Sequence, residues 1–178
     1  MAVRHFTAAP WPKTLKAVSA LGTAALLGAS MVALRAVPAS LGFTHYFGLG
    51  IALVPPTLIV FSLLFMVTGF GISATTLSIQ RPFWATEMSI SGLQAVSFEP
   101  GICRKSIRIF GNAGLFGFTG LYSNSSLGRY RLFGTDLACS VVLTLPDRKL
   151  VITPAGPEDF VLHMRRAFPQ IDHAAPKV

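Results

Sequence analysis

Hydrophobic residues dominate two stretches of the N-terminal half, and both are long enough to cross a lipid bilayer as helices. Ala17–Leu34 holds eighteen uncharged residues. The second stretch lies within Ala36–Gln80, forty-five residues without an Asp, Glu, Lys or Arg. Because a helix rises about 1.5 Å per residue, about 20 residues cross a hydrocarbon core of roughly 30 Å. The pattern predicts a transmembrane anchor in residues 17–73, with helices at about 17–36 and 51–73.

Two features of this anchor leave alternatives open. Pro55 and Pro56 either begin the second helix, where a missing N–H costs nothing, or kink a helix that begins near Gly48. The first hydrophobic segment is either a retained helix or a signal cleaved at Val37-Pro38-Ala39.

Small residues recur at four-residue steps along the first segment. They form the rows Ala20–Ala24–Gly28 and Ala25–Ala29–Ala33. Such rows allow helices to pack closely in lipid, although an Ala-rich helix without a partner preference has the same composition. We expect one of these rows to be a packing face.

Beyond Ile72 the hydrophobic period changes from helical to two, which is typical of β-strands. The clearest hairpin is CSVVLTL–PD–RKLVIT, in which Pro146 and Asp147 supply the turn. Short alternating runs separated by Gly, Pro, Asn and Ser predict about seven strands, at Thr75–Gln80, Phe83–Ile90, Leu93–Phe98, Ser106–Phe110, Gly128–Phe133, Cys139–Leu145 and Lys149–Thr153.

The last element returns to helical spacing. Pro157 suits the first turn of a helix, and Arg165-Arg166 suit the last turn. The apolar stripe consists of Phe160, Val161, Met164 and Phe168. The predicted class is therefore α+β: two transmembrane helices, then an antiparallel barrel or sandwich of about seven strands, capped by this helix.

The strand-then-helix order is that of a pleckstrin-homology-like (PH-like) fold, and one stretch carries specific motifs. The Gly/Phe-rich segment G-x-x-G-x-F-G-F-x-G-x-Y is followed by a strand pair, Leu127–Arg131 with Thr135-Asp136. The helix start has Pro154 and Phe160. The residues that match the Gly/Phe-rich segment are Gly111, Gly114, Phe116, Gly117, Gly120 and Tyr122. Across Ser73–Phe168 the chain resembles a bacterial PH-like domain family, whose members are small membrane-anchored proteins.

These predictions divide the chain into four parts. A cytoplasmic tail (1–16) precedes the anchor (17–73), and the PH-like domain (74–168) precedes a flexible tail (169–178). Residues 1–35 contribute half of the net charge of +8, next to a hydrophobic segment, which indicates an orientation signal rather than nucleic-acid binding. We expect a two-pass protein of the bacterial inner membrane, with the N-terminus and the domain in the cytoplasm.

Two groups of residues are candidate contacts for lipid or a partner. The cations are Arg104, Lys105, Arg108, Arg129 and Arg131, and the apolar loop residues are Leu115, Phe116 and Phe118. A solvated strand face is the ordinary account of the cations. The loop residues either pack on the protein or dip into the bilayer. The Thr135-Asp136 pair is expected to cap a turn.

The sequence offers no catalytic or metal-binding pattern. Its histidines are scattered, and the thiols of Cys103 and Cys139 lack companions at metal spacing, so each is expected to be reduced, with a single disulfide as the lesser option. We therefore predict no enzyme activity, no cofactor and no small-molecule substrate. The predicted function is a membrane-anchored binding or assembly module for another membrane protein or a second copy. The alternative is a sensor of anionic lipid headgroups.

Overall fold

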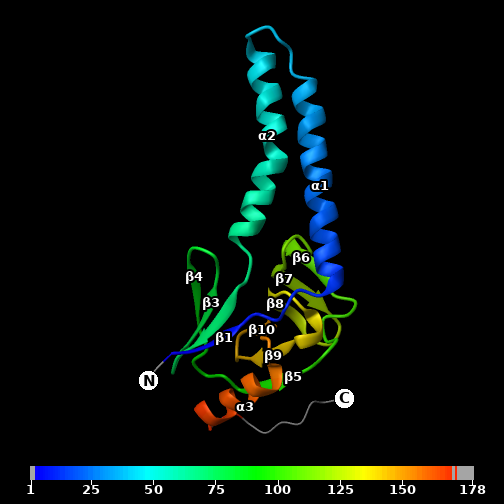
Figure 1. Ribbon diagram of the computed structural model, residues 1–178. Helices are drawn as coiled ribbons and strands as arrows, with labels where there is room; N and C mark the ends of the chain where they lie inside the picture. The colour runs from blue at the N-terminus through cyan, green and yellow to red at the C-terminus, as the bar shows by residue number, and fades with distance from the viewer. Residues whose placement is uncertain (1–2, 170, 172–178) are drawn as a thin grey trace.

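The computed structural model describes residues 3–169 and 171. Two long antiparallel helices stand on one end of a β-rich domain, and a short helix covers the opposite end (Figure 1). The long helices are α1 (Lys13–Arg35) and α2 (Phe43–Leu64), both long and apolar enough to span a membrane. Pro55 and Pro56 lie inside α2, so the helix begins well before them.

The end of the second hydrophobic segment is not helical. Gly69–Ile72 forms strand β2, and all four of its residues are buried in the domain. The predicted helix to residue 73 is wrong because hydrophobicity alone does not distinguish a segment buried in lipid from one buried in a protein core.

The segment before α1 also belongs to the domain. Strand β1 (Arg4–Thr7) pairs antiparallel with β2, from Arg4 opposite Ile72 to Thr7 opposite Gly69 (Figure 1). The next residues continue the attachment, because Ala9 donates to the Thr153 carbonyl at 2.8 Å and accepts from the Thr135 hydroxyl. The predicted tail is therefore part of the domain from Arg4 to Ala9. Cleavage after Ala39 would remove an edge strand of the domain.

The strands form two sheets. The first is antiparallel, in the order β1-β2-β3-β4, with β3 at Thr76–Gln80 and β4 at Ala85–Ser89. The second has the order β5-β9-β10-β8-β7-β6 and is antiparallel except for the parallel pair β8–β10. Its strands are β5 (Ala95–Phe98), β6 (Ile107–Ala113), β7 (Phe118–Asn124), β8 (Gly128–Gly134), β9 (Val141–Thr144) and β10 (Lys149–Ile152).

The α+β class is confirmed, whereas the described residues contain ten strands instead of about seven. The three additional strands are β1, β2 and β7. β7 begins inside the Gly/Phe-rich segment, which reads as a loop because its glycines interrupt the apolar alternation. The predicted hairpin around Pro146 and Asp147 is confirmed as β9–β10.

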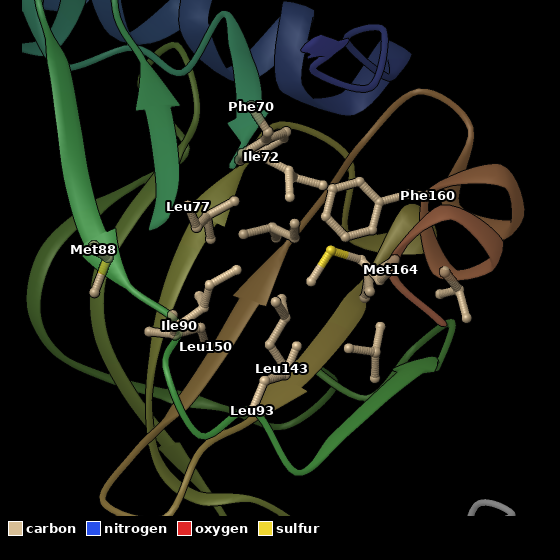
Figure 2. Packing of buried hydrophobic residues seen from close by; sticks show 14 of the residues in the cluster. Phe70, Ile72, Leu77, Met88, Ile90, Leu93, Leu143, Leu150, Phe160 and Met164 are labelled. Atoms are coloured by element: carbon tan, nitrogen blue, oxygen red, sulfur yellow. The ribbon is translucent and has the colours of Figure 1, made fainter. Parts of the chain in front are cut away.

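The C-terminal helix α3 (Pro157–Ala167) closes the main core as predicted. Figure 2 shows Phe160 and Met164 of α3 pointing toward Leu143 and Leu150 of the six-stranded sheet. Both α3 side chains are fully buried, which stabilises the fold by about 1.5–3 kcal/mol each. Ile171 is also buried in this cluster. The rest of the predicted tail, apart from Pro169, lies outside the described residues.

The helices α1 and α2 are joined by a specific hydrogen bond. Pro56 has no N–H, so the carbonyl of Ala52, four residues earlier, loses its helical donor. Ser30 of α1 donates to this carbonyl at 2.7 Å, and both residues are buried. This contact does not use the two predicted rows of small residues. Ala20, Ala24 and Gly28 of the first row are exposed, and so are Ala25 and Ala29 of the second.

We predict that Phe6→Ala destabilises the protein by about 2 kcal/mol, because it removes an apolar side chain and an aromatic pair. Phe6 lies edge-on to Phe160 with ring centroids 4.9 Å apart, which ties β1 to α3. Thermal unfolding of the full chain in detergent measures this loss. The exposed neighbour His5, changed to Ala, is the matched control. Equal melting temperatures for the two variants would contradict the attachment of β1.

Candidate functional site

The loop between β6 and β7 is fixed to α1. Ser19 of α1 donates its hydroxyl hydrogen to the Gly114 carbonyl at 3.2 Å and accepts from the Phe116 N–H at 2.9 Å. Gly22, one turn further, leaves room for Leu115, and the Trp11 and Phe116 rings lie 6.1 Å apart. Leu115 and Phe116 therefore pack on the protein, against α1, which is one of the two arrangements expected for the apolar loop.

The loop is internally braced. The Asn112 side chain accepts from the Leu115 N–H at 3.3 Å and donates to the Leu115 carbonyl, and the Tyr122 hydroxyl donates to the Asn112 carbonyl at 2.7 Å. Phe116 has a positive φ of 63°, which costs a residue with a side chain roughly 1–3 kcal/mol. The bonds to Ser19 and Asn112 hold the loop in this conformation.

Two glycines of the Gly/Phe-rich segment allow β6 and β7 to approach closely. Gly111 and Gly120 face each other across the pair, with φ values of 114° and 145°. A Cβ on either residue would lie 2.1 Å from a carbonyl oxygen of the other strand. A side chain at either position would therefore push the strands apart.

Strand β6 is an edge of the six-stranded sheet and is unusually apolar on its exposed surface. Ile107, Ile109 and Phe110 are 73%, 50% and 79% exposed. A bulge between Arg108 and Phe110 interrupts its pairing with β7. Edge strands usually carry charges or prolines that discourage further pairing, so an apolar edge marks a contact surface.

The candidate cations lie on different surfaces. Directly opposed residues in neighbouring strands share a face of a sheet, and Arg108 is opposite Tyr122, which is opposite Tyr130. Arg131 is opposite Leu121, and Arg129 is opposite Ser123, so these two arginines lie on the other face. Arg104 and Lys105 are exposed in the turn that precedes β6.

The structure does not bring Arg104 and Lys105 together with the apolar loop. The turn lies at the start of β6 and the loop at its end. The strand between them has seven residues, which separates the two groups by about 20 Å. Phe118 differs from the loop tip, because it is the first residue of β7 and packs beside a buried cluster.

That cluster contains two tyrosines, Tyr122 and Tyr130, whose pKa values are raised well above the ordinary value. Tyr122 and Tyr130 stack with centroids 6.1 Å apart, and the Tyr130 hydroxyl donates to the Ser106 hydroxyl at 2.7 Å. Burial raises the pKa of Tyr122 to about 12 and raises the pKa of Tyr130. Burial also raises the pKa of the Cys103 thiol, which weakens it as a nucleophile. At neutral pH these groups stay uncharged.

The cysteines, the Asp136 turn and the potential metal ligands were also considered in the sequence. Cys103 and Cys139 are both free thiols. Asp136 caps the 3-10 turn η1 (Leu137–Cys139), accepting from the Ala138 N–H at 3.0 Å, as predicted. Within residues 3–169 and 171, no three His, Cys, Asp or Glu side chains gather as a metal site would require.

Arg81 is a buried cation that the sequence predictions did not single out as a candidate. It is only 8% exposed, and it donates from Nη1 to the Phe65 carbonyl at the end of α2 and from Nε to the Thr86 hydroxyl. The guanidinium carbon lies 5.1 Å from the centre of the Phe65 ring, and burial lowers the pKa of Arg81. The one salt bridge found in the described part of the chain joins Arg148 and Asp147. Arg81 therefore lacks a carboxylate partner there.

Two more aromatic side chains belong to the β3–β4 turn that carries Arg81. The Trp84 ring lies edge-on to the Phe65 ring, with centroids 5.3 Å apart. Phe83, in the turn between β3 and β4, is 80% exposed. The sequence did contain a signal for this site, because Arg81 is the first charge after forty-five uncharged residues and directly precedes Pro82-Phe83-Trp84.

We predict that Ser19→Ala releases the β6–β7 loop from α1. The change removes both hydrogen bonds of the Ser19 hydroxyl, so amide exchange at Phe116 should accelerate roughly tenfold. Hydrogen–deuterium exchange of the detergent-solubilised full chain measures the rate. Thr14→Ala, at an exposed position near the start of α1, is the control. Unchanged exchange at Phe116 in Ser19→Ala would show that α1 does not hold the loop.

Comparisons with known proteins agree with the fold. The model of the bacterial PH domain family matches residues 68–167, which is more than half of the chain. The match starts just before β2 and ends with α3, so it leaves out β1, α1 and α2. No curated protein and no solved structure matches the chain. The chain belongs to the bacterial PH domain family.

Proposed function

We propose that this chain is a membrane-anchored, non-catalytic binding module. It holds a PH domain at the cytoplasmic face of the bacterial plasma membrane and offers strand β6 to a protein partner. The observation that carries the proposal is the apolar, exposed edge formed by Ile107, Ile109 and Phe110.

The exposed surface of the long helices supports membrane insertion. Their side chains are almost entirely apolar and very few of them are buried in the protein. Leu21, Val32, Leu53 and Val60 are each at least half exposed. A continuous apolar surface of this kind is unfavourable in water and is satisfied by lipid chains.

The pairing of β1 with β2 supports a two-pass topology. The two strands flank the helical hairpin in the sequence and pair in space, so both ends of the hairpin are on the same side of the bilayer. Lys13 and Lys16 lie in the first turn or so of α1, and Arg4 precedes them. The other end of the hairpin has a single cation, Arg35, because residues 36–42 between the helices have no charge. By the positive-inside rule, the domain is cytoplasmic.

The domain is held close to the bilayer by contacts to both helices. Ser19 fixes the β6–β7 loop to α1, and Arg81 fixes the β3–β4 turn to the end of α2. Ser19 is six residues after Lys13, about 9 Å along α1. The tip of the β6–β7 loop therefore lies at the level of the lipid headgroups.

The geometry of β6 fits a partner that adds a strand. A sheet edge has unpaired N–H and C=O groups, which give affinity, while side chains beside them give specificity. Ile107 is at the end of β6 farther from the β6–β7 loop, which makes it accessible to a partner in the cytoplasm. The partner is a second copy of the chain or another membrane protein.

The lipid-sensor alternative receives less support from the geometry. It requires Arg104, Lys105 and Arg108 to act together with the Leu115–Phe118 loop on the same membrane surface. Arg104 and Lys105 lie at the far end of β6 from a loop that is already bound to α1. No observation in the described residues joins the two groups.

We predict that a photo-crosslinking amino acid at Ile107 captures a protein partner in native membranes, because the partner strand lies beside β6. The same amino acid at Leu162, which is 48% exposed on α3, is the matched control and should capture none. Denaturing gel electrophoresis measures the products. A product of twice the monomer mass identifies a second copy of the chain, and any other mass identifies a different protein.

A second variant tests whether the contact is strand addition. Ile109→Pro, placed at the bulge, removes one backbone N–H and should reduce crosslinking from Ile107 roughly fivefold, as the loss of one hydrogen bond of about 1 kcal/mol implies. Equal yields from Ile107 and Leu162 would refute the β6 contact. An undiminished yield in Ile109→Pro would refute strand addition.

A further inference from the structure

A cavity of about 320 Å³ lies where the end of α2 meets strands β6 and β7. Leu58 and Phe61 of α2 form one wall with Phe65, the residue directly after α2, and Phe110 and Thr119 of the sheet form the other. Arg81 also lines the cavity. The site is therefore mostly apolar and contains one cation. Arg81 is buried, whereas Arg129 and Arg131 are exposed to solvent.

The bonding of Arg81 leaves one of its terminal nitrogens available. Nη1 and Nε are used by the Phe65 carbonyl and the Thr86 hydroxyl. Nη2 makes no hydrogen bond within the described residues. The fully buried side-chain atoms without a partner in those residues are Thr23 Oγ1 and Arg148 Nε, so Nη2 retains some exposed surface. Nη2 is therefore unbonded and not completely buried.

A cation in this position favours an anion as its partner. Arg81 is more than nine-tenths buried, and the described chain supplies no carboxylate to it. Taking a charge out of water without a counter-ion is unfavourable, and a guanidinium suits the oxygens of a phosphate. Capping the end of α2 uses the bond from Nη1, so this structural role does not account for Nη2.

The walls of the cavity indicate that the anion carries an apolar chain. Leu58 and Phe61 line the cavity and are half exposed on α2. In the proposed membrane-inserted state, lipid chains lie against this surface and reach the cavity along it. Arg81 comes directly after α2 and β2–β3, at the level where headgroups are expected. An amphiphile with an anionic head matches this order of apolar and charged groups.

We propose that the cavity at Arg81 binds an anionic phospholipid of the cytoplasmic leaflet. The phosphate lies against Nη2 of Arg81, and one acyl chain follows Leu58 and Phe61. The site shares Phe110 with the β6 edge offered to a protein, and it rests on the proposed membrane insertion only because the lipid reaches it from the bilayer.

Native mass spectrometry of the detergent-purified full chain tests this site. The probes are phosphatidylglycerol, phosphatidylcholine and inorganic phosphate. The unmodified chain should retain one phosphatidylglycerol in preference to phosphatidylcholine, and Arg81→Gln should lower this retention roughly tenfold, as loss of a charge-assisted bond implies. Arg104→Gln removes an exposed charge and should leave retention unchanged.

A second variant protects the test against misfolding of Arg81→Gln. Ser62→Leu narrows the cavity from α2 without altering Arg81, and it should also lower retention. Equal retention of the two lipids, which is the behaviour of annular lipid, would overturn the proposal. Undiminished retention in folded Arg81→Gln or in Ser62→Leu would do the same, and so would displacement of the lipid by inorganic phosphate. Extraction of the chain from membranes by alkaline carbonate would instead refute membrane insertion, so the two failures are distinct.

Discussion

The pairing of β1 with β2 is the constraint on which the rest of the structure depends. These strands lie on either side of a helical hairpin of about fifty residues, and their hydrogen bonds close that segment into a loop anchored in the domain. The cost of closing a loop grows only slowly with its length, so a few strand contacts and the packing of Phe6 on Phe160 can maintain it. The helices are consequently held at both ends, and the domain cannot turn freely beneath them.

Polar contacts make this anchor more specific than two apolar rods. Ser30 satisfies the Ala52 carbonyl that Pro56 leaves without a donor, so a proline that would weaken α2 becomes a point of attachment to α1. Ser19 and Arg81 perform the same task at the domain end, each supplying hydrogen bonds to a backbone that regular secondary structure does not satisfy. These contacts orient the β6 edge and the Arg81 cavity relative to the two long helices.

Local patterns predicted the elements whose stability is local. The β9–β10 hairpin follows from Pro146 and Asp147, and α3 follows from Pro157 and its apolar stripe. β1 has no local signal, because it pairs with a strand more than sixty residues away. β2 pairs with the neighbouring β3, but its sequence continues the hydrophobic run of α2 and therefore resembles the end of a membrane helix. Ser19 and Ser30 look unremarkable in an Ala-rich helix, and only their tertiary partners give them a role. The candidate loop was recognised from its glycines and phenylalanines, whereas Arg81 is a single cation with no repeating pattern.

The most direct test of the account is the accessibility of single cysteines to a membrane-impermeant maleimide in bacterial cells. In a Cys103→Ser, Cys139→Ser background, a cysteine at Ser40, between the helices, should react in intact spheroplasts. Cysteines at His5 on β1 and Asp147 in the β9–β10 turn should react only after lysis, because the proposed topology has both positions on the cytoplasmic side. Reaction of His5→Cys and Asp147→Cys on opposite sides of the membrane would contradict the account, since β1 would then be unable to pair within the domain.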